Sequence, residues 1–245
     1  MDFLKDFIEK NKKLVITAAL TLGTFFYTIL IGVVDRKPIG PEESKVGWAA
    51  LNGSFRDAIG ENPVWDKITD VMMIIAILTA VSFIAIGVIQ LIQTKNVFKV
   101  EKTIWGLAGV YVLMVLLYII FDKIIKINMR PIIEDGGKLE CSYPSSHVFI
   151  ICTIMGTAYV AWGKIRFFKE KSMVLECLRI SAIAVMAITV AGRLVSGVHW
   201  FTDIWGGVLF AAMLISAYIT ALPMIKFKAR EKKKTKREER RDTIY

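Results

Sequence analysis

Hydrophobic residues fall along the chain in six long blocks separated by charged segments. Each block has roughly the length that crosses a bilayer as a helix. The blocks cover residues 14–34, 71–92, 104–121, 148–163, 179–195 and 204–223. Apart from Arg179 and Arg193, near opposite ends of the fifth block, they contain no Asp, Glu, Lys or Arg. With 55% hydrophobic residues and a mean hydropathy of +0.52, this pattern predicts an all-α integral membrane bundle of six transmembrane helices.

Basic residues concentrate on one side of the predicted bundle. If the N-terminus is inside, the cytoplasmic segments hold 22 of the 32 Lys and Arg residues: four before the first block, three near residue 100, five at 164–179 and ten after the last block. The positive-inside rule therefore predicts that both termini are cytoplasmic. The first block is too long for a signal-peptide core and no small-residue cleavage site follows it, so we expect an uncleaved anchor.

The net charge of +10 comes mostly from the C-terminal end. Residues 226–245 hold ten basic and four acidic residues and have no apolar periodicity. We interpret them as a disordered cytoplasmic tail near anionic headgroups and residues 1–225 as one membrane domain. The charge therefore does not indicate a nucleic-acid partner.

The longest predicted loop on the opposite side covers residues 35–67. Its apolar residues Trp48, Leu51, Phe55 and Ile59 fall at helical spacing. This spacing suggests a short amphipathic helix on the bilayer surface. A loop that merely packs over the bundle fits equally well.

Polar residues that could take part in catalysis lie where the fifth block ends and the sixth begins, in GRLVSGVHWFTD at 192–203. His199 and Asp203 are four residues apart, so a helix that included both would place the carboxylate beside the imidazole. His199 is then a candidate nucleophile. Arg193, beyond a predicted bend at Gly197, could return to the same pocket and bind a phosphate. Taken alone, an interfacial histidine with a snorkelling arginine fits equally well.

Two further stretches lie on the same predicted side of the membrane. In YPSSH at 143–147, Ser145 can cap the fourth helix, and Ser146 and His147 occupy its first turn, where free backbone N–H groups attract anions. His147 could protonate the leaving oxygen of a phosphate. In DKIIKINMRP at 122–131, Lys123 and Arg130 are about two helical turns apart, so both can project from one face of a helix that Pro131 ends.

Each stretch alone has an ordinary explanation as a cap or as interfacial charge. Together they bring both histidines of the chain and complementary cations to one side of the membrane, which favours a phosphate site. The three cysteines lack metal-ligand spacing, and no Gly-rich phosphate loop, HExxH or acidic metal cluster occurs. No metal or other cofactor is expected.

Lys123 to Arg130-Pro131, then Pro144 to His147, then Arg193 to His199 to Asp203 resemble the three signature motifs of the type-2 phosphatidic acid phosphatase family, which includes vanadium haloperoxidases. Two positions depart from the family pattern. Ser146 replaces the glycine of Pro-Ser-Gly-His, and Gly192 replaces the serine before the arginine of the third motif. The second departure removes a hydroxyl that would help to bind phosphate.

The resemblance implies a role for each matching residue. His199 would be the nucleophile that forms a phosphohistidine, Asp203 its orienting partner and His147 the general acid. The phosphoryl oxygens would be bound by Lys123, Arg130, Ser145, Ser146 and Arg193.

The resemblance implies a metal-independent membrane hydrolase that acts on a lipid phosphate or diphosphate at the extracytoplasmic surface. The similarity to short bacterial members suggests a bacterial cell membrane and undecaprenyl diphosphate, phosphatidylglycerophosphate or phosphatidate as the substrate. A lipid phosphotransferase that uses the same site, and a non-catalytic protein that binds anionic lipids, remain alternatives. The sequence does not determine the oligomeric state.

Overall fold

Helices form nearly all of the regular structure in the computed structural model, which describes residues 9–133 and 137–225. The longer helices are α2 (Lys12–Val33), α3 (Ala49–Ile59), α4 (Pro63–Thr94), α5 (Lys102–Ile119), α6 (Ser146–Trp162), α8 (Ser172–Ser196) and α9 (Phe201–Ala221). Shorter turns are η1 (Pro41–Glu43), η2 (Val97–Lys99), η3 (Ile120–Ile125), α7 (Arg166–Lys169) and η4 (Leu222–Met224). The predicted all-α fold is confirmed.

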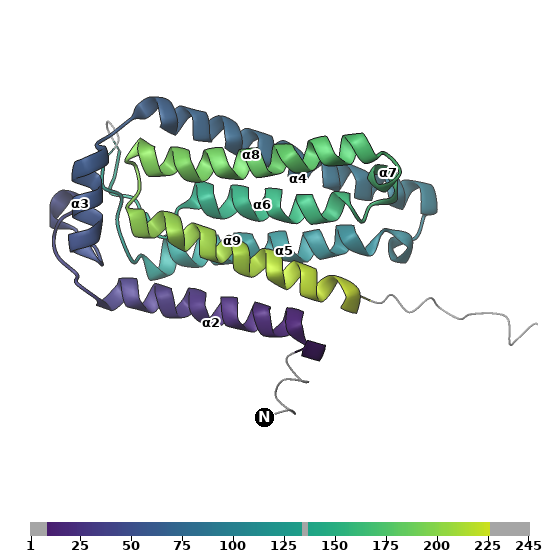
Figure 1. Cartoon of the computed structure of the whole chain (residues 1–245), viewed down its shortest axis with the longest axis horizontal. Coiled ribbons are helices and arrows are strands. Elements are labelled where there is room, and N and C mark those ends of the chain that lie inside the picture. Colours follow the sequence, from purple (N-terminus) through teal and green to yellow (C-terminus); the bar gives the residue numbers. More distant parts are fainter. Residues whose placement is uncertain (1–8, 134–136, 226–245) are drawn as a thin grey trace, which may run out of the picture.

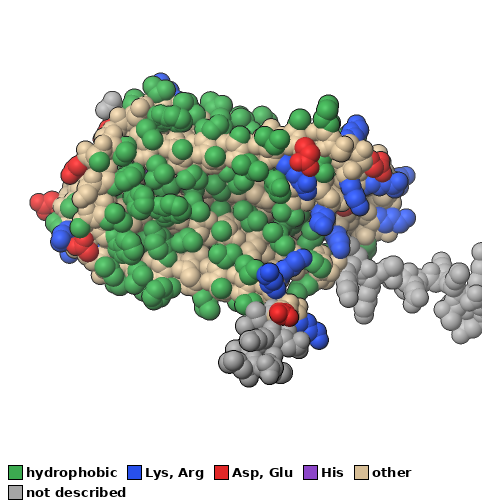
Figure 2. Space-filling view, in the orientation of Figure 1, with side chains coloured by type: hydrophobic (Ala, Val, Ile, Leu, Met, Phe, Trp, Pro, Cys, Tyr) green, Lys and Arg blue, Asp and Glu red, His purple; other side chains and the backbone are tan. Residues whose placement is uncertain are grey.

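Five of these helices are long and apolar enough to cross a membrane: α2, α4, α5 with its continuation η3, α8 and α9. Their outward side chains are apolar, as shown by Leu22, Val112 and Ile180, which are each more than 60% exposed. Hydrophobic side chains cover the middle of the visible face (Figure 2). Such a surface is stable only in lipid, so the chain is a multi-pass membrane protein.

The sixth predicted span, α6, is a shorter apolar helix of 17 residues in the centre of the bundle (Figure 1). Twelve of its residues are buried, and it packs against α4, α5, α8 and α9. The Phe149 ring meets that of Phe210 on α9 at 5.6 Å between centroids, and Phe121 meets Phe210 at 5.0 Å. Because protein encloses α6, its first turn lies inside the molecule rather than at the lipid surface.

α4 begins two turns earlier than the apolar pattern predicts. The Asn62 side chain caps it by accepting hydrogen bonds from Val64 N at 3.2 Å and Trp65 N at 3.4 Å. Pro63 stands at the first helical position, where its missing N–H costs nothing. The helix therefore includes Asp66 and Asp70, which the hydrophobic pattern places before the span.

The 35–67 segment contains the predicted short helix, α3, and this helix also packs on the bundle. α3 crosses one end of the bundle (Figure 1). The fully buried Asn52 donates to Thr202 Oγ1 at 2.9 Å and accepts from Thr202 N at 3.1 Å. Leu51 and Ile59 remain about 40% exposed. The predicted helix is therefore present, and it packs on the bundle as the alternative interpretation expects.

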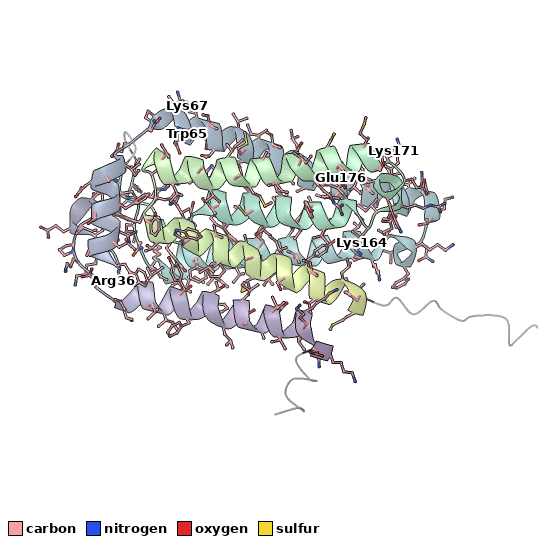
Figure 3. All side chains as sticks on the ribbon, viewed as in Figure 1. Arg36, Trp65, Lys67, Lys164, Lys171 and Glu176 are labelled. Carbon is pink, nitrogen blue, oxygen red and sulfur yellow. The ribbon has the colours of Figure 1, made fainter. Side chains whose placement is uncertain are left out.

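The two ends of the bundle carry different residues. Arg36 and Trp65 lie at the α3 end, whereas Lys164 and Lys171 lie at the opposite end near α7 (Figure 3). Lys and Arg side chains gather visibly at that second end (Figure 2). The predicted tail at 226–245 lies outside the described residues. All three sequence motifs lie at the α3 end.

Candidate active site

His199 lies in the short turn between α8 and α9. α8 ends at Ser196, Gly197 adopts a left-handed φ of 73°, and α9 begins at Phe201. The predicted bend at Gly197 is confirmed. The prediction that His199 and Asp203 share a helical face is wrong, because His199 precedes the helix and Asp203 lies in its first turn. The chain must turn sharply at Gly197 to bring Arg193 and His199 to one site.

Ser142 connects the histidine to the aspartate. Its Oγ lies 2.9 Å from His199 Nδ1, and its hydroxyl also hydrogen-bonds to the Asp203 carboxylate. The neutral imidazole that donates from Nδ1 to Ser142 keeps its lone pair on Nε2. Nε2 is buried and has no hydrogen-bond partner among the described residues. This nitrogen is therefore the one available to attack.

Asp203 is fully buried and held from three sides. Asn128 Nδ2 donates to its Oδ1 at 2.8 Å, and Trp200 N donates to its Oδ2 at 3.2 Å. Asn128, also fully buried, accepts from Gly47 N at 3.1 Å. A buried carboxylate needs such donors. Asp203 is therefore oriented by Asn128, Trp200 and Ser142, and Asn128 is itself held by Gly47, which lies outside the three motifs.

Arg193 points from the last turn of α8 towards the first turns of α4. Its side chain is only 3% exposed. Nη1 donates to Asp66 Oδ1, and Nη2 lies 3.8 Å from Asp70 Oδ1. Its Nε is buried without a partner among the described residues. The guanidinium thus has a near carboxylate, Asp66, a farther one, Asp70, and one N–H that can donate to a phosphate oxygen.

The second motif occupies the predicted position at the start of α6. Ser145 is the N-cap residue, and Ser146 and His147 fall in the first turn. The Ser145 side chain, however, makes no capping hydrogen bond. Its Oγ is buried without a partner in the described part of the chain, while Ser145 N donates to Asp203 O at 2.9 Å. The motif is therefore fixed by its backbone, and the hydroxyl remains available to an anion.

The first motif differs from the prediction in geometry. After Ile119 the helix widens into the π-turn η3, and Lys126 then adopts a left-handed φ of 45°. Arg130 lies outside the helix, where its N donates to Glu140 O at 2.9 Å. Lys123 and Arg130 therefore do not share a helical face. Lys123 is 73% exposed and pairs with Asp122 at 2.6 Å.

A cavity of about 260 Å³ brings the first two motifs together. Lys123, Lys126 and Arg130 line it together with Pro144 and Ser146. Two carboxylates, those of Asp122 and Glu140, also face it, and Arg130 lies 3.3 Å from Glu140. The cavity has an excess of positive charge beside the second motif, as a phosphate-bearing headgroup requires.

Electrostatics connect the third motif to the other two. Burial lowers the pKa of the His199 imidazole well below its ordinary value, and the charges of Arg193, Arg130 and His147 lower this pKa further. These side chains therefore lie close enough to His199 for their charges to act on it. A histidine with such a pKa is neutral near pH 7 and can act as a nucleophile.

Gly192 faces α4 rather than the phosphate-binding groups. A Cβ at this position would lie 2.7 Å from Thr69 Cγ2 and 3.1 Å from Trp65 Cε3. The glycine thus allows α8 and α4 to approach closely, which a serine would obstruct. This packing explains why the chain departs from the serine of the family motif.

Sequence reasoning missed four residues of this site: Asp66, Asp70, Asn128 and Ser142. The first two carried a recognisable signal, since Asn62-Pro63 is a helix start and two aspartates four apart share a face. Asn128 and Ser142 lie in irregular segments. Only the folded path of those segments brings them to Asp203 and His199.

Two comparisons with known proteins find a similarity, one in sequence and one in fold. Residues 107–226 match the PAP2 superfamily, and this segment contains all three motifs. One solved structure, described as the first transmembrane PAP2 type phosphatidylglycerolphosphate phosphatase from Bacillus subtilis, has a similar fold with a TM-score of 0.57. It is 20% identical, and the similarity covers 87% of this chain and 98% of that one. No curated protein matches the chain in sequence. The motif-bearing segment at 107–226 thus matches the PAP2 superfamily in sequence, and the chain as a whole resembles a PAP2 type phosphatase in fold.

Proposed function

We propose that the protein is a lipid phosphatase that works through a phosphohistidine at His199. The observation that carries this proposal is a neutral, buried histidine whose Nε2 has no partner among the described residues and whose neighbours Arg193, Arg130 and His147 bear positive charge or can acquire it. These cations match the charge on the oxygens of a transferring phosphoryl group. A merely structural histidine would have its second nitrogen satisfied.

In the first step, His199 Nε2 attacks phosphorus and the bond from phosphorus to the leaving oxygen breaks. Ser142 and Asp203 hold the ring and stabilise the positive charge that it gains. His147 donates its proton to the leaving oxygen, which departs as a lipid alcohol or a lipid phosphate. Arg193, Ser145 and the backbone N–H of Ser146 bind the three oxygens of the phosphoryl group.

In the second step, water attacks the phosphorus of the phosphohistidine. His147, now neutral, accepts the proton of the water. The bond from phosphorus to nitrogen breaks, inorganic phosphate leaves and His199 is regenerated. The cycle consumes one lipid phosphate and one water and yields one dephosphorylated lipid and one inorganic phosphate. This stoichiometry requires no redox partner and no metal ion.

The substrates that we propose are undecaprenyl diphosphate, phosphatidylglycerophosphate and phosphatidate. The fold similarity to a phosphatidylglycerolphosphate phosphatase supports the second of these, and the cationic cavity at Lys123, Lys126 and Arg130 could hold a headgroup of any of the three. The acyl or prenyl chain would remain in lipid, so we expect the substrate to enter sideways between the spans.

We further propose that the site faces the extracytoplasmic side, with both termini cytoplasmic, in a bacterial cell membrane. The concentration of basic residues at the end opposite to the motifs supports this orientation. A single cysteine at position 138 should be labelled by an impermeant thiol reagent in intact cells, and one at position 171 should not, both in a cysteine-free background. The reverse pattern would contradict the orientation.

The experiment that tests the activity uses purified protein, the three lipids and an assay of released inorganic phosphate. We expect release from at least one lipid, unchanged turnover in EDTA, and inhibition by vanadate, which mimics the five-coordinate transition state. Phosphate that moves to another acceptor instead of water would identify a phosphotransferase. Absence of any turnover would contradict the proposed function.

A further inference from the structure

Two carboxylates that belong to none of the three motifs enter the site from α4. Asp66 and Asp70 are one helical turn apart, in the part of α4 that precedes the predicted span. Asp66 accepts from Arg193 Nη1. Asp70 Oδ1 lies 2.9 Å from His147 Nε2 and only 3.8 Å from Arg193 Nη2. The two aspartates thus have different main partners.

The contact with Asp70 determines which nitrogen of His147 can react. The His147 side chain is 17% exposed, and its Nδ1 is buried without a partner among the described residues. Because a carboxylate only accepts, Nε2 carries the proton in the contact with Asp70. When the ring is fully protonated, Nδ1 holds the second proton and can give it away. His199 has the opposite arrangement: its Nδ1 is hydrogen-bonded to Ser142, and its Nε2 has no partner among the described residues.

We propose that Asp70 is a positioning residue for His147, which holds the ring and stabilises its protonated form so that Nδ1 can protonate the leaving oxygen. This inference rests on the proposed function, since it assigns a partner to the general acid of that reaction. It makes the site a pair of oriented histidines: one supported by Ser142 and Asp203, the other by Asp70.

The charges around His147 explain why it needs such a partner. Burial opposes a positive charge on the ring, and so do the guanidinium of Arg193 on α8 and any charge on His199. Asp70, which also hydrogen-bonds to the ring, and Asp66, both on α4, favour the positive charge. Asp70 is itself 57% exposed, so water screens part of its charge. We therefore expect its removal to weaken the acid step and not to abolish catalysis.

An alternative is that both aspartates only neutralise the buried Arg193. The chain supplies a matched control for this, because Asp66→Asn removes the nearer counter-ion of Arg193 and leaves the contact between Asp70 and His147. Asp66→Asn should change turnover by a similar factor on every substrate. Asp70→Asn should instead affect most strongly those substrates whose leaving group must be protonated.

The test compares two substrates with different leaving groups. Phosphatidate releases an alcohol, which must be protonated, whereas farnesyl diphosphate releases farnesyl phosphate, which needs no proton to depart. We expect Asp70→Asn to lower kcat/KM, which reports the reaction up to the departure of the leaving group, about 10- to 100-fold on phosphatidate and less than about 3-fold on farnesyl diphosphate. The alkaline limb of the kcat profile on phosphatidate should move to lower pH. In a His147→Ala background, Asp70→Asn should cause no further loss on phosphatidate, because Asp70 acts through the histidine.

Equal losses on both substrates, an unchanged alkaline limb, or a further loss in the His147→Ala background would overturn the role of Asp70 while the phosphatase activity stood. Wild-type protein that releases no phosphate from either lipid would overturn the proposed function and this inference together. The double variant also keeps the test decisive if Asp70→Asn folds poorly, since a folding defect would add to the His147→Ala loss.

Discussion

Replacing Gly192 by serine, the residue of the family motif, is expected to destabilise this protein. The new Cβ would lie 2.7 Å from Thr69 Cγ2 and 3.1 Å from Trp65 Cε3. Thr69 cannot easily turn its methyl away, because it is fully buried and its hydroxyl donates to Asp66 O at 2.7 Å. The indole of Trp65 is rigid. α4 and α8 must therefore move apart.

Overpacking of this kind costs about 1–3 kcal/mol. For a chain of this size each kcal/mol lowers Tm by about 2–4 °C, so we expect a Tm lower by about 2–12 °C. Turnover should fall as well, because the same displacement moves Asp66 and Asp70 away from Arg193 and His147. The measurements are thermal unfolding in detergent, followed by tryptophan fluorescence, and phosphate release.

Gly109 on α5 provides the matched control. A Cβ there would meet nothing within 4 Å, and alanine favours helix over glycine by up to about 1 kcal/mol. Gly109→Ala should therefore leave Tm unchanged or raise it. A Gly192→Ser variant with wild-type Tm and higher turnover would refute the reasoning, because it would mean that position 192 faces the phosphate.

Three further predictions concern the site. Asn128→Ala should lower kcat about 10- to 100-fold, because a hydrogen bond to a charged group contributes about 1.5–3 kcal/mol and Asp203 loses that donor; phosphate release measures this, and wild-type kcat would contradict it. The acid limb of kcat/KM should have its midpoint below pH 6.5, since burial and nearby cations lower the pKa of His199 from 6.5 and only the neutral ring attacks; a midpoint above 6.5 would contradict this. Lys123→Ala should lower kcat/KM less than about 10-fold and Arg193→Ala more than about 100-fold, because Lys123 is 73% exposed and Arg193 only 3%; equal losses would argue against the geometry of the first motif.

The sequence was sufficient to predict the spans and the key catalytic candidates, for a physical reason. Charged residues are costly in a membrane, so His147, Arg193 and His199 are conspicuous at the ends of apolar blocks. Their convergence on one end of the bundle then follows from alternating the direction of the spans. The structure places all three around one buried site, with α6 enclosed at the centre.

What the sequence could not predict depends on tertiary contacts. A hydrophobic pattern does not detect the polar first turns of α4, and so it places Asp66 and Asp70 before the span. The spacing of Lys123 and Arg130 suggests one helical face only if the helix stays regular, and the π-turn η3 interrupts it. Ser142 reaches His199 through an irregular segment that has no periodicity to interpret.

The central claim is that His199 accepts the phosphoryl group, and trapping the intermediate tests it most directly. In His147→Ala, farnesyl diphosphate should still phosphorylate the protein, because its leaving group needs no proton, whereas hydrolysis should be slow without the base. After a quench in base, mass spectrometry of the peptides should find phosphate on the one that contains His199, and none when His199→Ala is added. Phosphate on another residue, or full turnover by the single variant His199→Ala, would contradict the account.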